Sequence, residues 1–283
     1  MADLKSYRTT LFIHRFFVYS VMLFLGLLAI VPIYILLINA TRSTEEINLG
    51  LTFIPSSNAA HNWAALTSRG FRISQGFFNS AFIAITSTAL NVYFSAMTAY
   101  GIHVYRFRGR NALWIAILII LMLPGSLSLI GFVQFMIHLR LMDNYIPLII
   151  PAIAGAGSVL FLMQYMKSIL SHSLIEAARI DGANEFYTFN KVILPVLTPA
   201  LAAQAIFSFV GSWNNFFMPF VLLSTESRFT LPMLVQMLRG DIYRTEVGGI
   251  YLGIAISIVP ILIFYTFMSR FIISGLTLGG VKE

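Results

Sequence analysis

Several uninterrupted apolar runs in this 283-residue chain reach the length that an α-helix needs to cross a lipid bilayer. Backbone groups in hydrocarbon must hydrogen-bond to one another, and a helix meets that need within a single segment. A membrane barrel would instead show short segments of alternating hydrophobicity, which this sequence lacks. We therefore predict an all-α, polytopic membrane protein with six transmembrane helices, at residues 16–39, 77–102, 113–137, 145–166, 197–222 and 249–273.

Charged residues are scarce and unevenly placed. Of the 29 Asp, Glu, Lys and Arg residues only Arg270, close to the end of the last span, falls inside a predicted span, and none of the five His residues does. Proton-driven transporters keep ionisable groups at membrane depth, and many channels select ions with charged rings, so this pattern argues against both. A sodium site built from backbone carbonyls would need no charge and stays open. Eleven of the 18 Lys and Arg residues fall on the side that holds both termini, which predicts cytoplasmic termini and explains the net charge of +7 without nucleic acid.

The chain carries no recognisable catalytic motif. It has no cysteine, so disulfides and thiolate metal sites are excluded. The ending GLTLGGVKE is not a phosphate-binding loop, because the lysine is misplaced and no Ser or Thr follows it. We predict that the chain is not an enzyme, holds no metal or cofactor, and takes energy for any uphill transport from another protein.

One compact polar stretch interrupts the apolar sequence between the fourth and fifth predicted spans. It reads SLIEAARIDGANEFYTFNKVILPVLTP (Ser173–Pro199) and is called the polar loop below. Ser173 and Glu176 have the spacing of a capping box, which predicts the start of a short helix. Gly182 permits a left-handed turn that ends this helix, and Asn184 can cap a second helix. The second helix is expected to carry Phe186, Phe189, Val192 and Ile193 on its apolar face.

The pattern E-A-A-x-x-D-G-A in this loop resembles the signature of permease subunits in binding-protein-dependent ABC importers. The matching residues are Glu176, Ala177, Ala178, Asp181, Gly182, Ala183 and the Leu-Pro pair at 194–195. The segments FRGR, SWNNFFMPFVLL and SGLTLGGVKE are also similar to family segments, so the resemblance covers about residues 77–283 and is greatest to the maltose-type, carbohydrate-importing branch. The chain departs from the family at Ser171, often proline in relatives, and at Asn215, where many relatives carry Glu.

The resemblance implies a type I ABC importer permease architecture in a bacterial cytoplasmic (inner) membrane. The six matched positions of the polar loop would form a coupling helix that docks into a cytoplasmic ATPase. ATP and Mg would then be bound by two ATPase subunits, while a second permease, an extracellular binding protein and a carbohydrate complete the set of partners. The expected division of the chain is an N-terminal part at 1–76, a permease core at 77–274 that includes the loop at 167–195, and a cytoplasmic tail at 275–283.

A polar stripe in the fifth predicted span is the candidate substrate path. Gln204, Ser208, Ser212 and Asn215 recur every three or four residues and so share one helix face, with Trp213 and Asn214 beside it. Amides and an aromatic ring suit a neutral sugar. Two alternatives stay open: these groups could bond to other helices instead, and the chain could be a self-sufficient secondary transporter or channel for a neutral solute.

Overall fold

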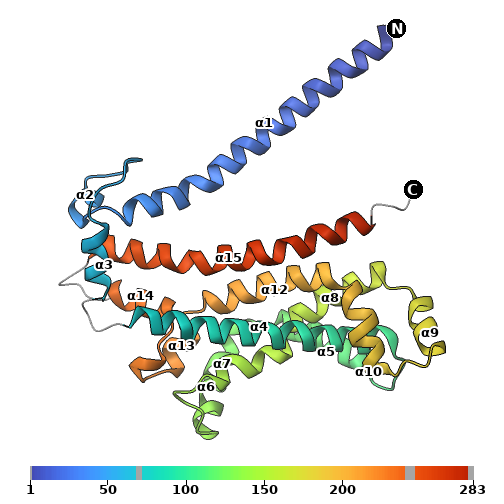
Figure 1. Cartoon of the computed structure of the whole chain (residues 1–283). Coiled ribbons are helices and arrows are strands. Elements are labelled where there is room, and N and C mark those ends of the chain that lie inside the picture. Colours follow the sequence, from blue (N-terminus) through green and yellow to red (C-terminus); the bar gives the residue numbers. More distant parts are fainter. Residues whose placement is uncertain (1, 68–71, 240–245, 280–283) are drawn as a thin grey trace. The chain divides into compact units, whose positions relative to one another are not determined.

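The computed structural model describes residues 2–67, 72–239 and 246–279, and every regular element in these ranges is helical (Figure 1). The last four residues of the predicted tail, 280–283, lie outside the described residues. In chain order the elements are α1 (Ala2–Asn39), α2 (Thr44–Asn48), α3 (Ala59–Thr67), α4 (Ile73–Val104), α5 (Arg110–Met122), α6 (Gly125–His138), α7 (Ile146–Ile149), η1 (Ile150–Ala154), α8 (Ala156–Ile169), α9 (His172–Ile180), α10 (Glu185–Tyr187), η2 (Thr188–Ile193), α11 (Leu194–Val196), α12 (Thr198–Trp213), α13 (Phe217–Leu222), η3 (Glu226–Arg228), α14 (Leu231–Arg239) and α15 (Val247–Gly279).

Four segments of the described chain are long and apolar enough to cross a membrane: Leu11–Asn39, Ile73–Val104, Ile146–Ile169 and Val247–Ile272. They contain or largely overlap the first, second, fourth and sixth predicted spans, which confirms these four as apolar helical segments. The fourth is not one regular helix, since α7 and η1 each begin around a proline before α8 completes the segment.

The third and fifth predicted spans are wrong as single helices. The run 113–137 breaks at Pro124, which is the N-cap of α6, because proline has no backbone N–H and its ring disfavours helical geometry in the residue before it. The run 197–222 stops at Trp213 and resumes at Phe217 as α13. The segments Glu185–Val196 and Thr198–Trp213 are long and apolar enough to cross a membrane only when they are taken together, and there is a bend of 81° between them. By length and composition the described chain therefore has four such segments, or five if this bent pair is one span, and the predicted count of six is not confirmed.

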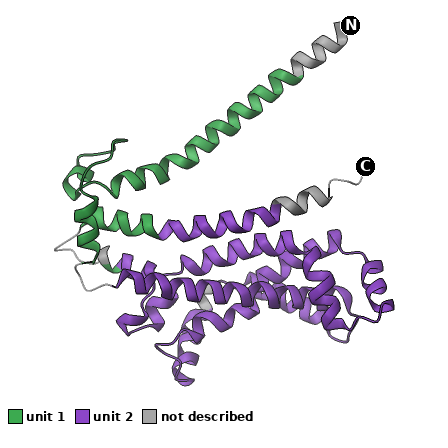
Figure 2. Cartoon of the chain, in the orientation of Figure 1, with its two compact units in different colours: residues 1–70, 237–256 green, residues 71–236, 257–283 purple. Residues whose placement is uncertain are grey.

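The chain divides into two compact units, and each is described by itself (Figure 2). Unit 1 comprises residues 1–70 and 237–256, and unit 2 comprises residues 71–236 and 257–283.

Arg42 organises the segment of unit 1 that follows α1. Its guanidinium donates to Asn39 Oδ1 at 3.1 Å, to the carbonyl of Gly50 at 3.0 Å and to the carbonyl of Glu46. The residue is only 6% exposed, and a buried charge of this kind needs its donors satisfied. Asn62 of α3 adds a bond to the Arg42 carbonyl at 2.9 Å. The segment after α1 is thus a defined polar structure.

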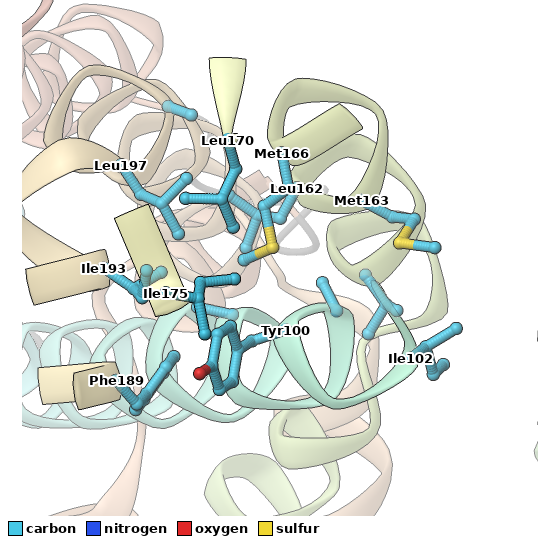
Figure 3. Close-up of a cluster of buried hydrophobic side chains, with 14 of the residues drawn as sticks. Tyr100, Ile102, Leu162, Met163, Met166, Leu170, Ile175, Phe189, Ile193 and Leu197 are labelled. Carbon is cyan, nitrogen blue, oxygen red and sulfur yellow. The ribbon is translucent and has the colours of Figure 1, made fainter. Parts of the chain in front are cut away.

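The apolar core of unit 2 lies where α4, α8 and the polar loop meet (Figure 3). Tyr100 of α4 and Met166 of α8 face Ile175, Phe189 and Ile193 of the polar loop. These three loop side chains are at most 3% exposed. Because burial of each such side chain stabilises the fold by about 1.5–3 kcal/mol, the polar loop is anchored by its apolar face to the helices.

Asp143, in the turn between α6 and α7, holds the segment that follows α13. Its carboxylate accepts the backbone N–H groups of Ser224 and Thr225 at 3.0 Å, the Thr225 hydroxyl at 2.5 Å and Arg228 Nη1 at 3.2 Å. We call these four residues the Asp143 clasp. The hydrogen bonds from Thr225, with that from Ser224 and the charge of Arg228, lower the pKa of Asp143 to about 2.

Replacing Asp143 by asparagine should destabilise unit 2 by about 1–2 kcal/mol at pH 7, because one carboxylate oxygen becomes an NH₂ group that cannot accept these bonds. The folded-state pKa lies below the ordinary 3.8, so the carboxylate's contribution is complete above about pH 5 and is lost as the pH falls toward 2. Thermal unfolding in detergent at pH 7 and pH 3 measures this, and the gap between the two proteins should narrow at pH 3. The exposed neighbour variant Glu226→Gln should match the wild type at both pH values. A gap of equal size at both pH values would contradict the assignment.

Candidate functional site

The first helix of the polar loop, α9, begins two residues earlier than the sequence predicts. The N-cap is Ser171, His172 is already helical, and no side-chain capping bond forms. Ser173 lies inside the helix and donates to Ser171 Oγ at 3.0 Å. The predicted capping box of Ser173 and Glu176 is therefore wrong. This start places Ile175 and Ala178 on the buried face of α9, so packing determines the helix boundary.

The turn after α9 forms as predicted. Gly182 has φ +79°, in the left-handed region that favours glycine, and its N–H donates to the carbonyl of Arg179 at 3.0 Å. The N–H of Ala183 donates to the carbonyl of Ala178 at 3.0 Å, which satisfies another end carbonyl of the helix. The predicted cap at Asn184 is also confirmed, because its Oδ1 accepts the N–H of Tyr187 at 2.8 Å.

The second predicted helix exists but is not regular. One turn of α10 leads into a π-helical stretch, η2, and then into α11, whose first turn contains Pro195. Phe189 and Ile193 of η2 are buried, as expected of the apolar face. Phe186 is 70% exposed instead, because the π-helical geometry changes the spacing along the chain.

The opposite side of the polar loop is exposed and hollowed. Glu176 and Asp181 are exposed, and so is the apolar side chain of Ile180, at 86%. An open hollow of about 560 Å³ lies between α9 and the following segment. It is lined by Leu174, Ala177, Ala178, Asp181, Gly182, Ala183, Asn184, Tyr187 and Val192. Five of the six predicted positions thus line one surface, and Glu176 lies on the same helix outside it.

Glu185 is a residue of this site that the sequence analysis missed. Its Oε1 accepts Nε and Nη2 of Arg179, each at 2.9 Å, and its Oε2 accepts the hydroxyl of Tyr105. The Glu185 carboxylate raises the pKa of Arg179. Burial, with the hydrogen bond to Glu185, raises the pKa of Tyr105. Arg179 and Glu185 stand six residues apart in one loop, which hints at pairing, but nothing in the sequence points to Tyr105.

Gln204 of the predicted substrate stripe is buried and bonded between helices. Its Nε2 donates to Ser158 Oγ of α8 at 2.6 Å, and Ser158 donates to Asn91 Oδ1 of α4 at 2.7 Å. Asn91 Nδ2 in turn donates to the carbonyl of Ala152 at 2.8 Å. Asn91, Ser158 and Gln204, here called the buried amide chain, are each less than 10% exposed. For Gln204 the geometry matches the helix-bonding alternative.

Among the described residues, the other five stripe residues have different surroundings. Ser212 accepts a hydrogen bond from Ser87 of α4 at 2.9 Å, and Trp213 is 1% exposed with its Nε1 donating to the carbonyl of Ser257 at 2.9 Å. Ser208 is half-buried, Asn214 is exposed, and Asn215 Oδ1 accepts the N–H of Met218 at 3.3 Å. Ser212, Trp213 and Asn215 touch a cavity of about 20 Å³, which has room for one water and not for a sugar ring.

Comparison with known proteins identifies the family of this chain and a solved structure of the same fold. Residues 91–277 match the model of the family described as "Binding-protein-dependent transport system inner membrane component". An arabinooligosaccharides transport system permease protein from Halalkalibacterium halodurans is 38% identical over 262 residues, which cover 92% of this chain and 93% of the relative. Its counterpart from Bacillus subtilis is 34% identical, over 91% of this chain and 92% of the relative.

A solved structure has the same fold. A chain in the crystal structure of a bacterial ABC transporter that imports the acidic polysaccharide alginate is similar to this chain with a TM-score of 0.75 and 25% identity. The similarity covers 90% of this chain and 96% of that one.

Proposed function

The chain belongs to the family of binding-protein-dependent transport system inner membrane components, and from that premise we propose how it works as the permease subunit of a sugar importer. The polar loop is the element by which a cytoplasmic ATPase moves this subunit. A second permease forms the other half of the path, and an extracellular binding protein delivers the sugar. ATP and Mg belong to two ATPase subunits, since the chain has no phosphate-binding loop of its own.

The observation that carries this proposal is the two-sided character of the polar loop. One side is anchored in the core by Ile175, Phe189 and Ile193, so a force on the loop reaches the helices. The other side leaves Glu176, Asp181 and a large apolar residue exposed, next to the open hollow. Exposed apolar and unpaired charged groups beside a concave surface are typical of a protein–protein interface.

We infer a neutral oligosaccharide as cargo. The two relatives described above carry arabinooligosaccharide transport in their names, at 38% and 34% identity over nearly the whole chain. The candidate path residues, in α12 and the two positions that follow it, are amides, hydroxyls and one indole, with no charge, and such groups suit a hydroxyl-rich neutral ligand. The related alginate importer handles an acidic polysaccharide. Because Gln204 and Trp213 are bonded inside the protein, we assign direct sugar contact to the less buried Ser208, Asn214 and Asn215.

The orientation follows from charge. The N-terminal tail, the loop that contains FRGR, the loop between the fourth and fifth predicted spans and the C-terminal segment together collect eleven of the 18 Lys and Arg residues. This bias supports a cytoplasmic location for both termini and for the polar loop.

Reconstitution in liposomes tests the function. The chain together with its second permease, ATPase and binding protein should import neutral arabino-oligosaccharides when ATP is supplied on the ATPase side, and uptake of acidic uronic oligosaccharides should be at least about tenfold lower. The chain alone should import neither sugar, with or without a sodium or proton gradient. Gradient-driven uptake by the chain alone would overturn the proposal in favour of a secondary transporter, and equal uptake of both sugars would overturn the neutral cargo.

A further inference from the structure

Glu185 connects the polar loop to the end of a transmembrane helix through both of its carboxylate oxygens. One oxygen takes two bonds from Arg179, which closes the loop upon itself across the Gly182 turn. The other accepts the hydroxyl of Tyr105, the residue that directly follows α4, and lies 3.5 Å from the hydroxyl of Tyr100 in the last turns of α4. A carboxylate that accepts from charged and hydroxyl donors makes stronger and more directional bonds than a neutral group would.

Aromatic contacts support the same connection. Tyr100 lies against Phe189 of η2 with ring centroids 5.3 Å apart, and Tyr105 meets Tyr100 edge to face at 5.9 Å. About two turns earlier in α4, Tyr93 also packs edge to face on Phe189 with ring centroids 5.8 Å apart. Its hydroxyl donates a hydrogen bond to Asn190 Oδ1 at 3.2 Å. The loop is therefore fastened along the last turns of α4 as well as at its end.

The surface role predicted for the loop carboxylates does not extend to Glu185. Glu176 and Asp181 face solvent with no partner among the described residues, whereas Glu185 has partners on both sides. These carboxylates thus divide into two groups by geometry. Two are available to another protein, and one holds the loop in position.

We propose that Glu185 is a positioning residue that fixes the polar loop to α4, so that the loop and α4 move as one body when the ATPase partners close. This inference rests on the proposed function. It names α4 as the transmembrane helix that receives the movement, because the hydrogen bonds of Glu185 and the aromatic contacts of Phe189 both end on α4 or on the residue after it. The carboxylate touches no substrate and acts through the loop.

The absence of cysteine allows a direct measurement of this attachment. Cysteines introduced at Ser173 of α9 and Met97 of α4, both exposed, carry spin labels in the assembled transporter. Pulsed electron spin measurements then give the distance distribution between loop and helix. We expect a narrow distribution with wild-type Glu185 and a distribution at least about twice as wide with Glu185→Gln, since the amide loses the charge that holds Arg179. Lys191→Gln, an exposed change in the same loop, should leave the width unchanged.

The same variants in the unlabelled transporter report coupling. With Glu185→Gln, the number of sugar molecules imported per ATP hydrolysed should fall by about tenfold, while ATP hydrolysis itself stays within about twofold of wild type. Tyr105→Phe, which removes only a hydroxyl, should give an intermediate loss of coupling and serves if Glu185→Gln fails to assemble.

The outcomes separate the two proposals. An unchanged distance distribution overturns the positioning role, and so does a wide distribution with normal coupling. If the wild-type transporter hydrolyses ATP but imports no sugar, the proposed function fails, and the distance measurement still decides whether Glu185 fixes the loop to α4.

Discussion

Replacing Gly182 by valine should abolish the coupling of ATP hydrolysis to sugar uptake while the subunit still inserts into the membrane. The backbone at Gly182 has φ +79°, where a β-branched residue is strained by about 1–3 kcal/mol. An added Cβ would meet no atom within 4 Å, so the strain comes from the backbone alone and not from a collision. The loop relieves the strain by leaving the left-handed turn, which breaks the bond of Gly182 N–H to the Arg179 carbonyl and reshapes the hollow.

Measured as sugar imported per ATP hydrolysed, the Gly182→Val transporter should show a loss of more than about tenfold. Gly182→Asn provides a graded comparison, because asparagine tolerates the left-handed region, and it should retain most of the coupling. Gly211, a helical glycine of α12 with open space around its Cβ position, provides a control in which Gly211→Ala should behave as wild type. Normal coupling in Gly182→Val would show that the turn has no part in docking.

The largest expected effect on stability comes from Gly155→Ala. A Cβ at Gly155 would lie 2.1 Å from Asn91 Nδ2 and 3.2 Å from Ser158 Oγ, so the buried amide chain has to move. Asn91 is 7% exposed and already bonded to the Ala152 carbonyl and to Ser158, which leaves its amide little room. Overpacking together with a lost buried hydrogen bond should cost about 3 kcal/mol.

Unfolding of the detergent-solubilised chain measures this loss. Gly157→Ala is the matched control, two residues further along the chain in the first turn of α8, because its Cβ would meet only Leu121 Cδ2 at an ordinary 3.7 Å. The control should be as stable as wild type or slightly more stable, given the better helix propensity of alanine. The double variant Asn91→Ala with Gly155→Ala should be less destabilised than the sum of the single changes, since removing the amide removes the clash. Equal stability of Gly155→Ala and Gly157→Ala would contradict the close packing around the buried amide chain.

The errors in the predicted spans have a common physical origin. The apolar composition of residues 113–137 indicates that this segment avoids water. It does not indicate that the first helix ends before Pro124 and that a second helix begins after it. The interruption of the helix at Asn214 is similar, because the short non-helical segment 214–216 lies in a run that is otherwise apolar. Composition determines which solvent a segment prefers, whereas the backbone hydrogen bonds determine where each helix ends.

In the polar loop, some features could be predicted from neighbouring residues and others could not. The turn at Gly182 and the cap at Asn184 depend on backbone conformation within a few residues, and both were predictable. The start of α9 at His172 was not, because Ser171 and Ser173 are equally able to cap a helix and burial of Ile175 decides between them. The π-helical stretch of η2 likewise gives no signal in the order of its residues.

By itself, the sequence determined that the chain is a helical membrane protein, that it resembles importer permeases, and which loop is polar enough to meet a partner. Each of these properties is local, since a segment's preference for lipid and a turn's need for glycine arise from neighbouring residues. Only the tertiary structure decided that Glu185 bonds to Tyr105 at the end of α4 and that Gln204 bonds to Ser158 and does not face the cargo. Those pairs stand 80 and 46 residues apart, and such contacts depend on how the helices pack, which no short stretch of sequence specifies.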